Sequence, residues 1–114
     1  MNLASLGKKL EELPSEIYSQ NKKVLEAEKE YKLEELAFDV AFAQALVGSK
    51  RSNATEKKHE AVIETDKMKQ DLIKQEWKLK KEEVYAKALN DQFTALRKLS
   101  SMEIEKMRSQ ISGH

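Results

Sequence analysis

Helix-breaking residues are almost absent from this sequence, and their scarcity limits the folds open to it. The 114 residues include one proline, Pro14, and three glycines, of which only Gly48 lies between residue 7 and the last two positions. Proline and glycine are the residues that helices tolerate least, whereas the abundant Ala, Leu, Glu and Lys favour helices. The sequence therefore predicts an all-α protein built from long helices with few breaks.

The few breakers divide the chain into three predicted helical segments. A short helix is expected over residues 3–13, and Pro14 suits the first position of a second helix because an N–H group would be unpaired there anyway. The second helix is predicted over residues 14–46, with Gly48 in a left-handed conformation just beyond its end. A loop is predicted over residues 48–53. Asn53 and Glu56 then form a capping pattern, which predicts a third helix over residues 54–109.

Two long helices joined by a short loop predict an antiparallel, coiled-coil-like hairpin that occupies residues 1–114 as a single domain. The third segment supports this fold because one set of its residues recurs at alternating steps of three and four, the spacing of a coiled-coil seam. The set is Thr65, Met68, Leu72, Gln75, Leu79, Glu82, Ala86, Leu89, Phe93 and Leu96.

One stretch, LAFDVAFAQALV over residues 36–47, is apolar on nearly every side of its helix. Such a helix must be covered on all sides, and one partner helix cannot do that. We therefore expect assembly into an oligomeric bundle or binding of a partner protein, the alternative being that the N-terminal segment folds back over this stretch. A second apolar stripe also widens the face of the third helix. The predicted oligomer interface is Leu36, Phe38, Val40, Phe42, Val47, Leu89, Phe93, Leu96 and Leu99.

Residues that carry catalytic or metal chemistry are sparse. The chain has no cysteine, which excludes disulfides, thiolate metal sites and a cysteine nucleophile. The two histidines, His59 and His114, have no serine or aspartate at a spacing that suggests a catalytic triad. Glu60 and Glu64 lack the accompanying histidine of carboxylate-bridged metal bundles. We expect no enzymatic activity, no metal and no cofactor.

Positive charge gathers at two places, although the formal net charge is only +1. One is the loop region, and the other surrounds Trp77, which has lysines three residues before it and four after it. A tryptophan flanked by lysines is typical of single-stranded nucleic-acid platforms, because the ring stacks on bases while ammonium groups neutralise phosphates. The alternative is that Trp77 belongs to the core and the lysines form a solvated face. The predicted nucleic-acid-binding residues are Lys50, Arg51, Lys57, Lys58, Lys74, Trp77, Lys78 and Lys81.

Three segments follow one another along the chain: EAEKEYKLEEL, TEKKHEAVIETD and LNDQFTALRKLSSMEIEKMR. This order, with the closing pattern from Leu89 to Met107, resembles small helical proteins that tailed phages encode among recombination genes, and UvsY-type recombination mediators. The resemblance covers about residues 18–108 and implies a helical, oligomeric protein that binds single-stranded DNA. Such mediators have a basic cluster in the first helix, where this chain has YKLEELAFDV with Lys32 as its only basic residue. Any DNA contact is therefore expected at the residues named above.

These observations predict a non-enzymatic accessory protein of phage DNA recombination or replication that binds single-stranded DNA, a recombination or replication protein, or both, as a homo-oligomer. The alternative is a protein-only coiled-coil interaction module, either an adaptor or an inhibitor of a host protein. The longest nearly uncharged run is too short to cross a bilayer. We therefore expect no membrane partner and a cytoplasmic location, in the host cell if a phage encodes the chain.

Overall fold

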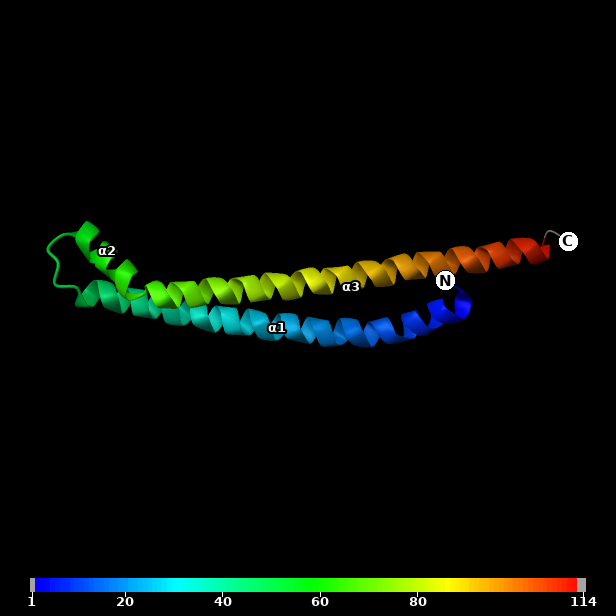
Figure 1. Cartoon of the computed structure of the whole chain (residues 1–114), viewed down its shortest axis with the longest axis horizontal. Coiled ribbons are helices and arrows are strands. Elements are labelled where there is room, and N and C mark those ends of the chain that lie inside the picture. The colour runs from blue at the N-terminus through cyan, green and yellow to red at the C-terminus, as the bar shows by residue number, and fades with distance from the viewer. Residues whose placement is uncertain (1, 113–114) are drawn as a thin grey trace. The chain divides into compact units, whose positions relative to one another are not determined.

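The computed structural model describes residues 2–112, so Met1, Gly113 and His114 lie outside the described part of the chain. Three helices are present: α1 (Leu3–Gly48), α2 (Ala54–Glu64) and α3 (Asp66–Ser112). α1 and α3 pack antiparallel as a helical hairpin, with α2 between them in the chain (Figure 1). The predicted all-α hairpin is confirmed. Its contacts separate into two compact units: unit 1 is Met1–Lys23 with Glu82–His114, and unit 2 is Val24–Lys81.

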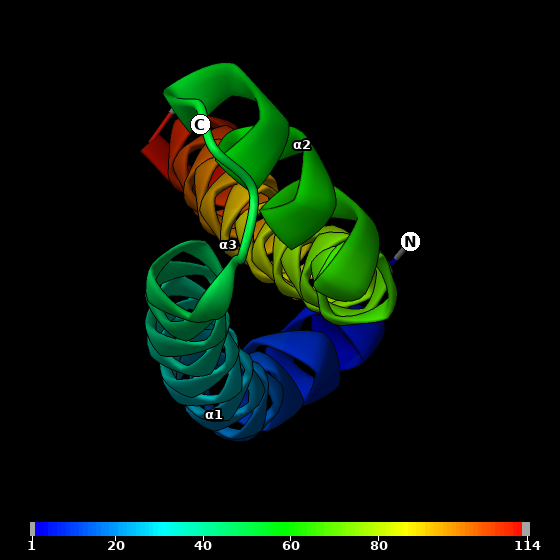
Figure 2. The same ribbon diagram turned by 90° about the vertical axis from the view of Figure 1, so that its left-hand side faces the viewer.

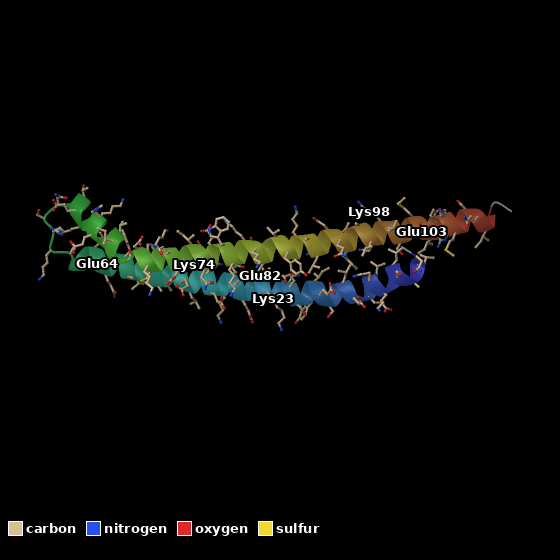
Figure 3. The ribbon with its side chains drawn as sticks, in the orientation of Figure 1. Lys23, Glu64, Lys74, Glu82, Lys98 and Glu103 are labelled. Carbon is tan, nitrogen blue, oxygen red and sulfur yellow. The ribbon has the colours of Figure 1, made fainter. Side chains whose placement is uncertain are left out.

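Unit 1 pairs the first part of α1 with the last part of α3 through large apolar side chains. Leu6 and Leu13 on α1 are 0% and 2% exposed, and Leu89 on α3 is also buried. A polar contact completes the interface, because the Gln20 amide donates hydrogen bonds to the backbone oxygen of Glu82 at 2.9 Å and to its carboxylate at 2.6 Å. Glu82 lies on the side of α3 that faces α1 (Figure 3).

Pro14 does not separate two helices, which corrects the prediction of a short helix over residues 3–13 and a new one from residue 14. α1 runs through Pro14 without interruption. An interior proline removes one backbone hydrogen bond and costs about 3 kcal/mol, but burial of Leu6 and Leu13 on α3 offsets that cost. Because residues 3–13 continue α1, they do not fold back over residues 36–47, and that alternative is wrong.

Unit 2 pairs the second part of α1 with α2 and the start of α3, and its buried residues are small or polar apart from one leucine. The buried set is Ala27, Ala61, Thr65 and Leu72. The side-chain oxygen of Gln75 is buried there without a hydrogen-bond partner among the described residues. Unit 2 therefore buries little large apolar surface within the chain.

The coiled-coil seam predicted from Thr65 to Leu96 is confirmed. Thr65, Leu72 and Leu89 are buried, and the other seven residues of the set are half-buried. α1 carries a matching seam at the same alternating spacing, which was not predicted. Its members are Leu6, Leu10, Leu13, Ile17, Gln20, Val24, Ala27, Tyr31, Glu34, Phe38, Ala41 and Ala45.

The predicted helix over residues 54–109 is interrupted at Thr65, which separates α2 from α3. Thr65 has φ −100° and ψ 9°, outside the helical range, and its hydroxyl donates to the backbone oxygen of Ala61 at 2.7 Å. A short side chain that bonds to the preceding turn competes with regular helix geometry. α2 consequently lies off the axis of α3 (Figure 2). α3 then continues to Ser112, three residues beyond the predicted end.

The loop region confirms one predicted helix boundary and corrects another. Asn53 caps α2, and its side-chain oxygen accepts a hydrogen bond from the backbone N–H of Glu56 at 2.8 Å. α1 ends at Gly48 instead of Leu46. No glycine within residues 2–112 has a positive φ, so the predicted left-handed conformation of Gly48 is wrong.

Candidate functional site

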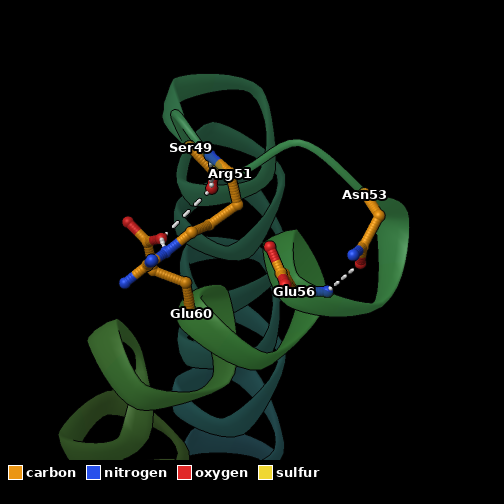
Figure 4. A network of polar contacts seen from close by, with 5 residues as sticks. All are labelled: Ser49, Arg51, Asn53, Glu56 and Glu60. Carbon is orange, nitrogen blue, oxygen red and sulfur yellow. Dashed lines mark hydrogen bonds and ion pairs between the residues drawn. The ribbon is translucent and has the colours of Figure 1, made fainter.

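The basic residues of the loop region differ in how freely their charges face solvent. Lys50 and Lys58 are exposed, and Lys57 is half-buried. The Arg51 guanidinium instead pairs with the Glu60 carboxylate at 3.0 Å, and the hydroxyl of Ser49 donates to the same carboxylate oxygen at 3.3 Å (Figure 4). Glu60 therefore offsets the Arg51 charge, and the loop is less positive than its sequence suggests.

A groove of about 640 Å³ lies beside α2 and the loop. Its lining residues are Arg51, Thr55, Glu56, His59, Glu60, Ile63 and Glu64. Three carboxylates against one guanidinium, which is already paired, make this groove unfavourable for a phosphate. Lys50 and Lys58 do not line this groove.

Trp77 points outward from α3 and so does not belong to the core, whereas its role in nucleic-acid binding stays a prediction. Its side chain is 71% exposed. Lys74 and Lys81 are exposed, and their positions at i−3 and i+4 place them on the same face of α3 as Trp77. Neither lysine forms an ion pair among the described residues. We name these three residues the Lys/Trp strip.

Lys78 is not part of the Lys/Trp strip, although the sequence grouped it there. Its ammonium lies 3.2 Å from the Glu30 carboxylate of α1, so it links the two helices within unit 2. Lys80 likewise pairs with Glu76 at 3.1 Å. These two pairs remove two lysines from the set available to a ligand and leave Lys74 and Lys81 beside the indole.

The residues predicted as an oligomer interface divide into an inward and an outward group. Phe38 and Phe42 stack with ring centroids 6.0 Å apart, and the Lys69 ammonium of α3 lies 5.0 Å from the Phe38 ring, so Phe38 faces α3. Leu89, Phe93 and Leu96 belong to the α3 seam. Phe38 and these three residues therefore face the opposite helix within the hairpin, and Phe42 stacks on Phe38. Their predicted role between copies stays a prediction.

The outward group forms a continuous apolar stripe on α1. Leu36, Val40 and Val47 are 61%, 48% and 88% exposed. Leu25 and Leu33, which the sequence interpretation missed, are also exposed on the same side of the helix. We name Leu25, Leu33, Leu36, Val40 and Val47 the α1 outer stripe. The signal that identifies it is its helical spacing relative to the α1 seam: Leu36 follows Ala27 by nine residues, so the two point about 180° apart.

A second outward stripe follows α3 in unit 1. Val84, Leu99 and Met102 are exposed, and Ala88 and Ala95 lie exposed between them. The sequence predicted Ala88, Ala95, Leu99 and Met102 as one stripe but not Val84, and Leu99 is the member that the predicted oligomer interface contains. Both stripes are runs of exposed apolar side chains along one face of a helix.

Within residues 2–112 no helix combines the length and apolarity that crossing a membrane requires. Comparisons with protein-family models, curated proteins and solved structures gave no match. The function must therefore be argued from the chain's own surfaces.

Proposed function

We propose that this chain is a non-catalytic, self-associating accessory protein that binds single-stranded DNA through the Lys/Trp strip. The observation that carries the proposal is the exposed indole of Trp77 between two lysines that form no ion pair among the described residues. An exposed indole between two cations offers a stacking face for a base next to charges that can meet phosphates.

The chemistry of the Lys/Trp strip suits single strands in particular. Bases of a single strand are unstacked enough to lie on an aromatic ring, which contributes about 1–3 kcal/mol per base without reading sequence. The two ammonium groups neutralise phosphates on either side of the stacked base and make the binding dependent on salt. One strip offers few contacts, so affinity depends on several copies that present their strips together.

The proposed setting is phage DNA recombination or replication, with a recombination protein as a further partner. This part rests on the resemblance of the sequence to UvsY-type mediators and not on the geometry. The first helix supports the assignment of DNA contact to α3, since residues 24–48 of α1 contain six carboxylates and only two lysines.

Intrinsic fluorescence tests the proposal directly because Trp77 is the only tryptophan. Titration with an unlabelled oligothymidylate should quench the Trp77 emission. Anisotropy of a labelled oligonucleotide should show binding that weakens steeply between about 50 and 200 mM salt. Trp77→Ala should weaken binding by about tenfold, and Lys74→Glu with Lys81→Glu should weaken it further.

Tyr85→Ala and Lys98→Glu are matched controls, because both remove exposed side chains of the same types from α3 outside the strip. Both should bind as the wild type does. The proposal fails if neither quenching nor an anisotropy change occurs up to high micromolar protein, or if Trp77→Ala binds as tightly as the wild type.

A protein-only interaction module is the second candidate, and the two outward apolar stripes favour it. Such a module needs no basic surface. Charge reversal of Lys74 and Lys81 separates the candidates, because a DNA-binding protein should lose affinity for the oligonucleotide whereas an adaptor should keep its protein partner.

A further inference from the structure

We propose that the α1 outer stripe is the interface of a two-fold symmetric dimer, in which α1 of a second copy packs antiparallel across it with Leu36 at the symmetry axis. The inference rests on the proposed self-association and is independent of DNA binding. The partner that covers the stripe is a second copy of this chain. Two features of α1 support this choice: the spacing of its apolar residues and the placement of its charges.

The first reason is that the stripe is nearly palindromic about Leu36. In an antiparallel pair centred there, Leu25 of one copy faces Val47 of the other, and Leu33 faces Val40. Leu36 then faces Leu36 of the second copy. A symmetric interface requires this self-complementarity, since each patch meets an identical patch turned end for end. A stripe shaped for an unrelated partner has no reason to possess it.

The second reason is the placement of charge beside the stripe. Lys32 and Asp39 lie on the same flank, and their positions are nearly symmetric about Leu36, so each Lys32 faces Asp39 of the second copy. When two identical helices pack antiparallel, a given flank of one helix lies against the same flank of the other. Two equivalent Lys32–Asp39 contacts therefore form in each dimer. Lys32 pairs with Glu28 at 3.0 Å within its own helix, whereas Asp39 has no ion pair among the described residues.

The one charge within the stripe is also accommodated. Lys29 lies between Leu25 and Leu33, and the palindrome sets it opposite Ala43 of the second copy. Both residues are exposed. The small alanine leaves room for the aliphatic part of the lysine, which can lie along apolar surface while its ammonium reaches water.

The dimer leaves the Lys/Trp strip free, because that strip belongs to α3. Each dimer would present two strips, which supplies the multivalency that weak single-strand contacts require. The contact follows α1 from Leu25 to Val47, about 35 Å at 1.5 Å per residue.

Pulsed dipolar spectroscopy tests the orientation and the register together. The chain has no cysteine, so Ala37→Cys and Gln44→Cys each carry a single nitroxide label, and both positions are exposed on one flank of the stripe. Labels at position 37 should be close, about 20 Å or less, because their offset along the helices is only about 3 Å. Labels at position 44 should be farther apart, since their axial offset is about 24 Å.

Leu36→Glu should abolish the dipolar signal of both labelled chains, whereas Leu99→Glu, the control on the α3 stripe, should leave it unchanged. Equal short distances at both positions indicate parallel packing and overturn the proposal. No dipolar signal at high micromolar protein, or a signal that survives Leu36→Glu, also overturns it.

A charge swap gives a second, milder test. Lys32→Glu should raise the dimer dissociation constant by about fivefold to tenfold, because it sets two like charges facing each other at the rim. Adding Asp39→Lys should restore the wild-type value. Both variants lack the Lys32–Glu28 pair, so a recovery isolates the contact between copies. If the double variant dimerises no better than Lys32→Glu, the proposed register is wrong.

Discussion

Units 1 and 2 both expose apolar side chains, but they differ in what they bury. Unit 1 buries three large residues, Leu6, Leu13 and Leu89, between α1 and α3. In unit 2 the interior consists mainly of Ala27, Ala61 and Thr65, with a single buried leucine. Of the larger residues in its α1 segment, Phe38 faces α3, whereas the α1 outer stripe faces outward.

This difference distinguishes apolar residues that stabilise the hairpin itself from apolar residues that are left for a contact outside it. Burial of large apolar groups drives folding, so unit 1 has the composition of a hairpin that holds itself together. Unit 2 buries fewer large side chains completely, so covering the α1 outer stripe should add to its stability. We expect unit 2 to be the less stable of the two as a monomer and the one that assembly stabilises.

The largest expected effect contrasts one leucine from each unit. Leu13→Ala should lower the free energy of unfolding by about 2–5 kcal/mol, because it opens a cavity in a filled interface. Leu36→Ala should change it by no more than about 0.5 kcal/mol when the chain is monomeric, as for an exposed position. Urea unfolding at low micromolar protein measures both. A loss at Leu36 as large as that at Leu13 would show that Leu36 packs within the chain.

A smaller effect, a change in the free energy of unfolding with opposite sign in the two units, is expected at two glutamines of the helix seams. Gln20→Ala should destabilise the hairpin by about 1–3 kcal/mol, because Glu82 loses two hydrogen bonds in unit 1. Gln75→Leu should stabilise it by about 1 kcal/mol, since it removes a buried oxygen that has no partner among the described residues. The same urea titration measures both changes in the free energy of unfolding. Changes of the same sign in the two variants would contradict the difference between the units.

The cap of α2 offers a test confined to unit 2. Asn53→Ala should cost about 1 kcal/mol, because the N–H of Glu56 loses its acceptor. Hydrogen exchange should accelerate in α2 and not in the segment of α1 that belongs to unit 1. Ser52→Ala is the matched control and should leave exchange unchanged. Acceleration throughout the chain would mean that the two units open together.

The smallest effect is a pH dependence that arises in unit 2. A hydrogen bond with Glu35 raises the pKa of Tyr31 above its ordinary value, and desolvation and the negative charges of Glu35 and Glu76 raise it further. The folded chain thus holds the phenol proton more tightly than the unfolded chain does. The resulting stability is present below about pH 10, the unfolded value, and is lost as the pH rises through the folded value.

Tyr31→Phe removes this contribution. Unfolding free energies of the wild type and of Tyr31→Phe, measured between about pH 9 and pH 12, should converge as the pH rises. Differences that stay constant over this range would show that the Tyr31 phenol does not titrate differently in the two states.

Spacing along the chain predicted the hairpin well because a seam depends only on residue order. The set from Thr65 to Leu96 was located correctly despite the polar Gln75 and Glu82, since alternating steps of three and four identify one face whatever its composition. The same test applied to Leu6, Leu10, Leu13 and Ile17 would have shown that α1 continues through Pro14. Proline propensity alone gave the wrong boundary there.

The sequence could not decide which residues of an all-round apolar helix turn inward. Leu36 and Phe38 are both apolar and two positions apart, and only the direction from which α3 approaches α1 makes Phe38 inward and Leu36 outward. Trp77 was undecided for the same reason. The helix interruption at Thr65 could not be predicted, because no proline or glycine lies there. It depends instead on the Thr65 hydroxyl, which donates a hydrogen bond to the preceding turn.

Sedimentation equilibrium of the wild type and of Leu36→Glu tests most directly whether the α1 outer stripe is covered by another copy. The apparent molecular mass of the wild type should rise with concentration, from the chain mass of 13.1 kDa toward at least about twice that value. Leu36→Glu should lose this association while keeping its helical content. A wild type that remains at 13.1 kDa up to about millimolar concentration would contradict the account.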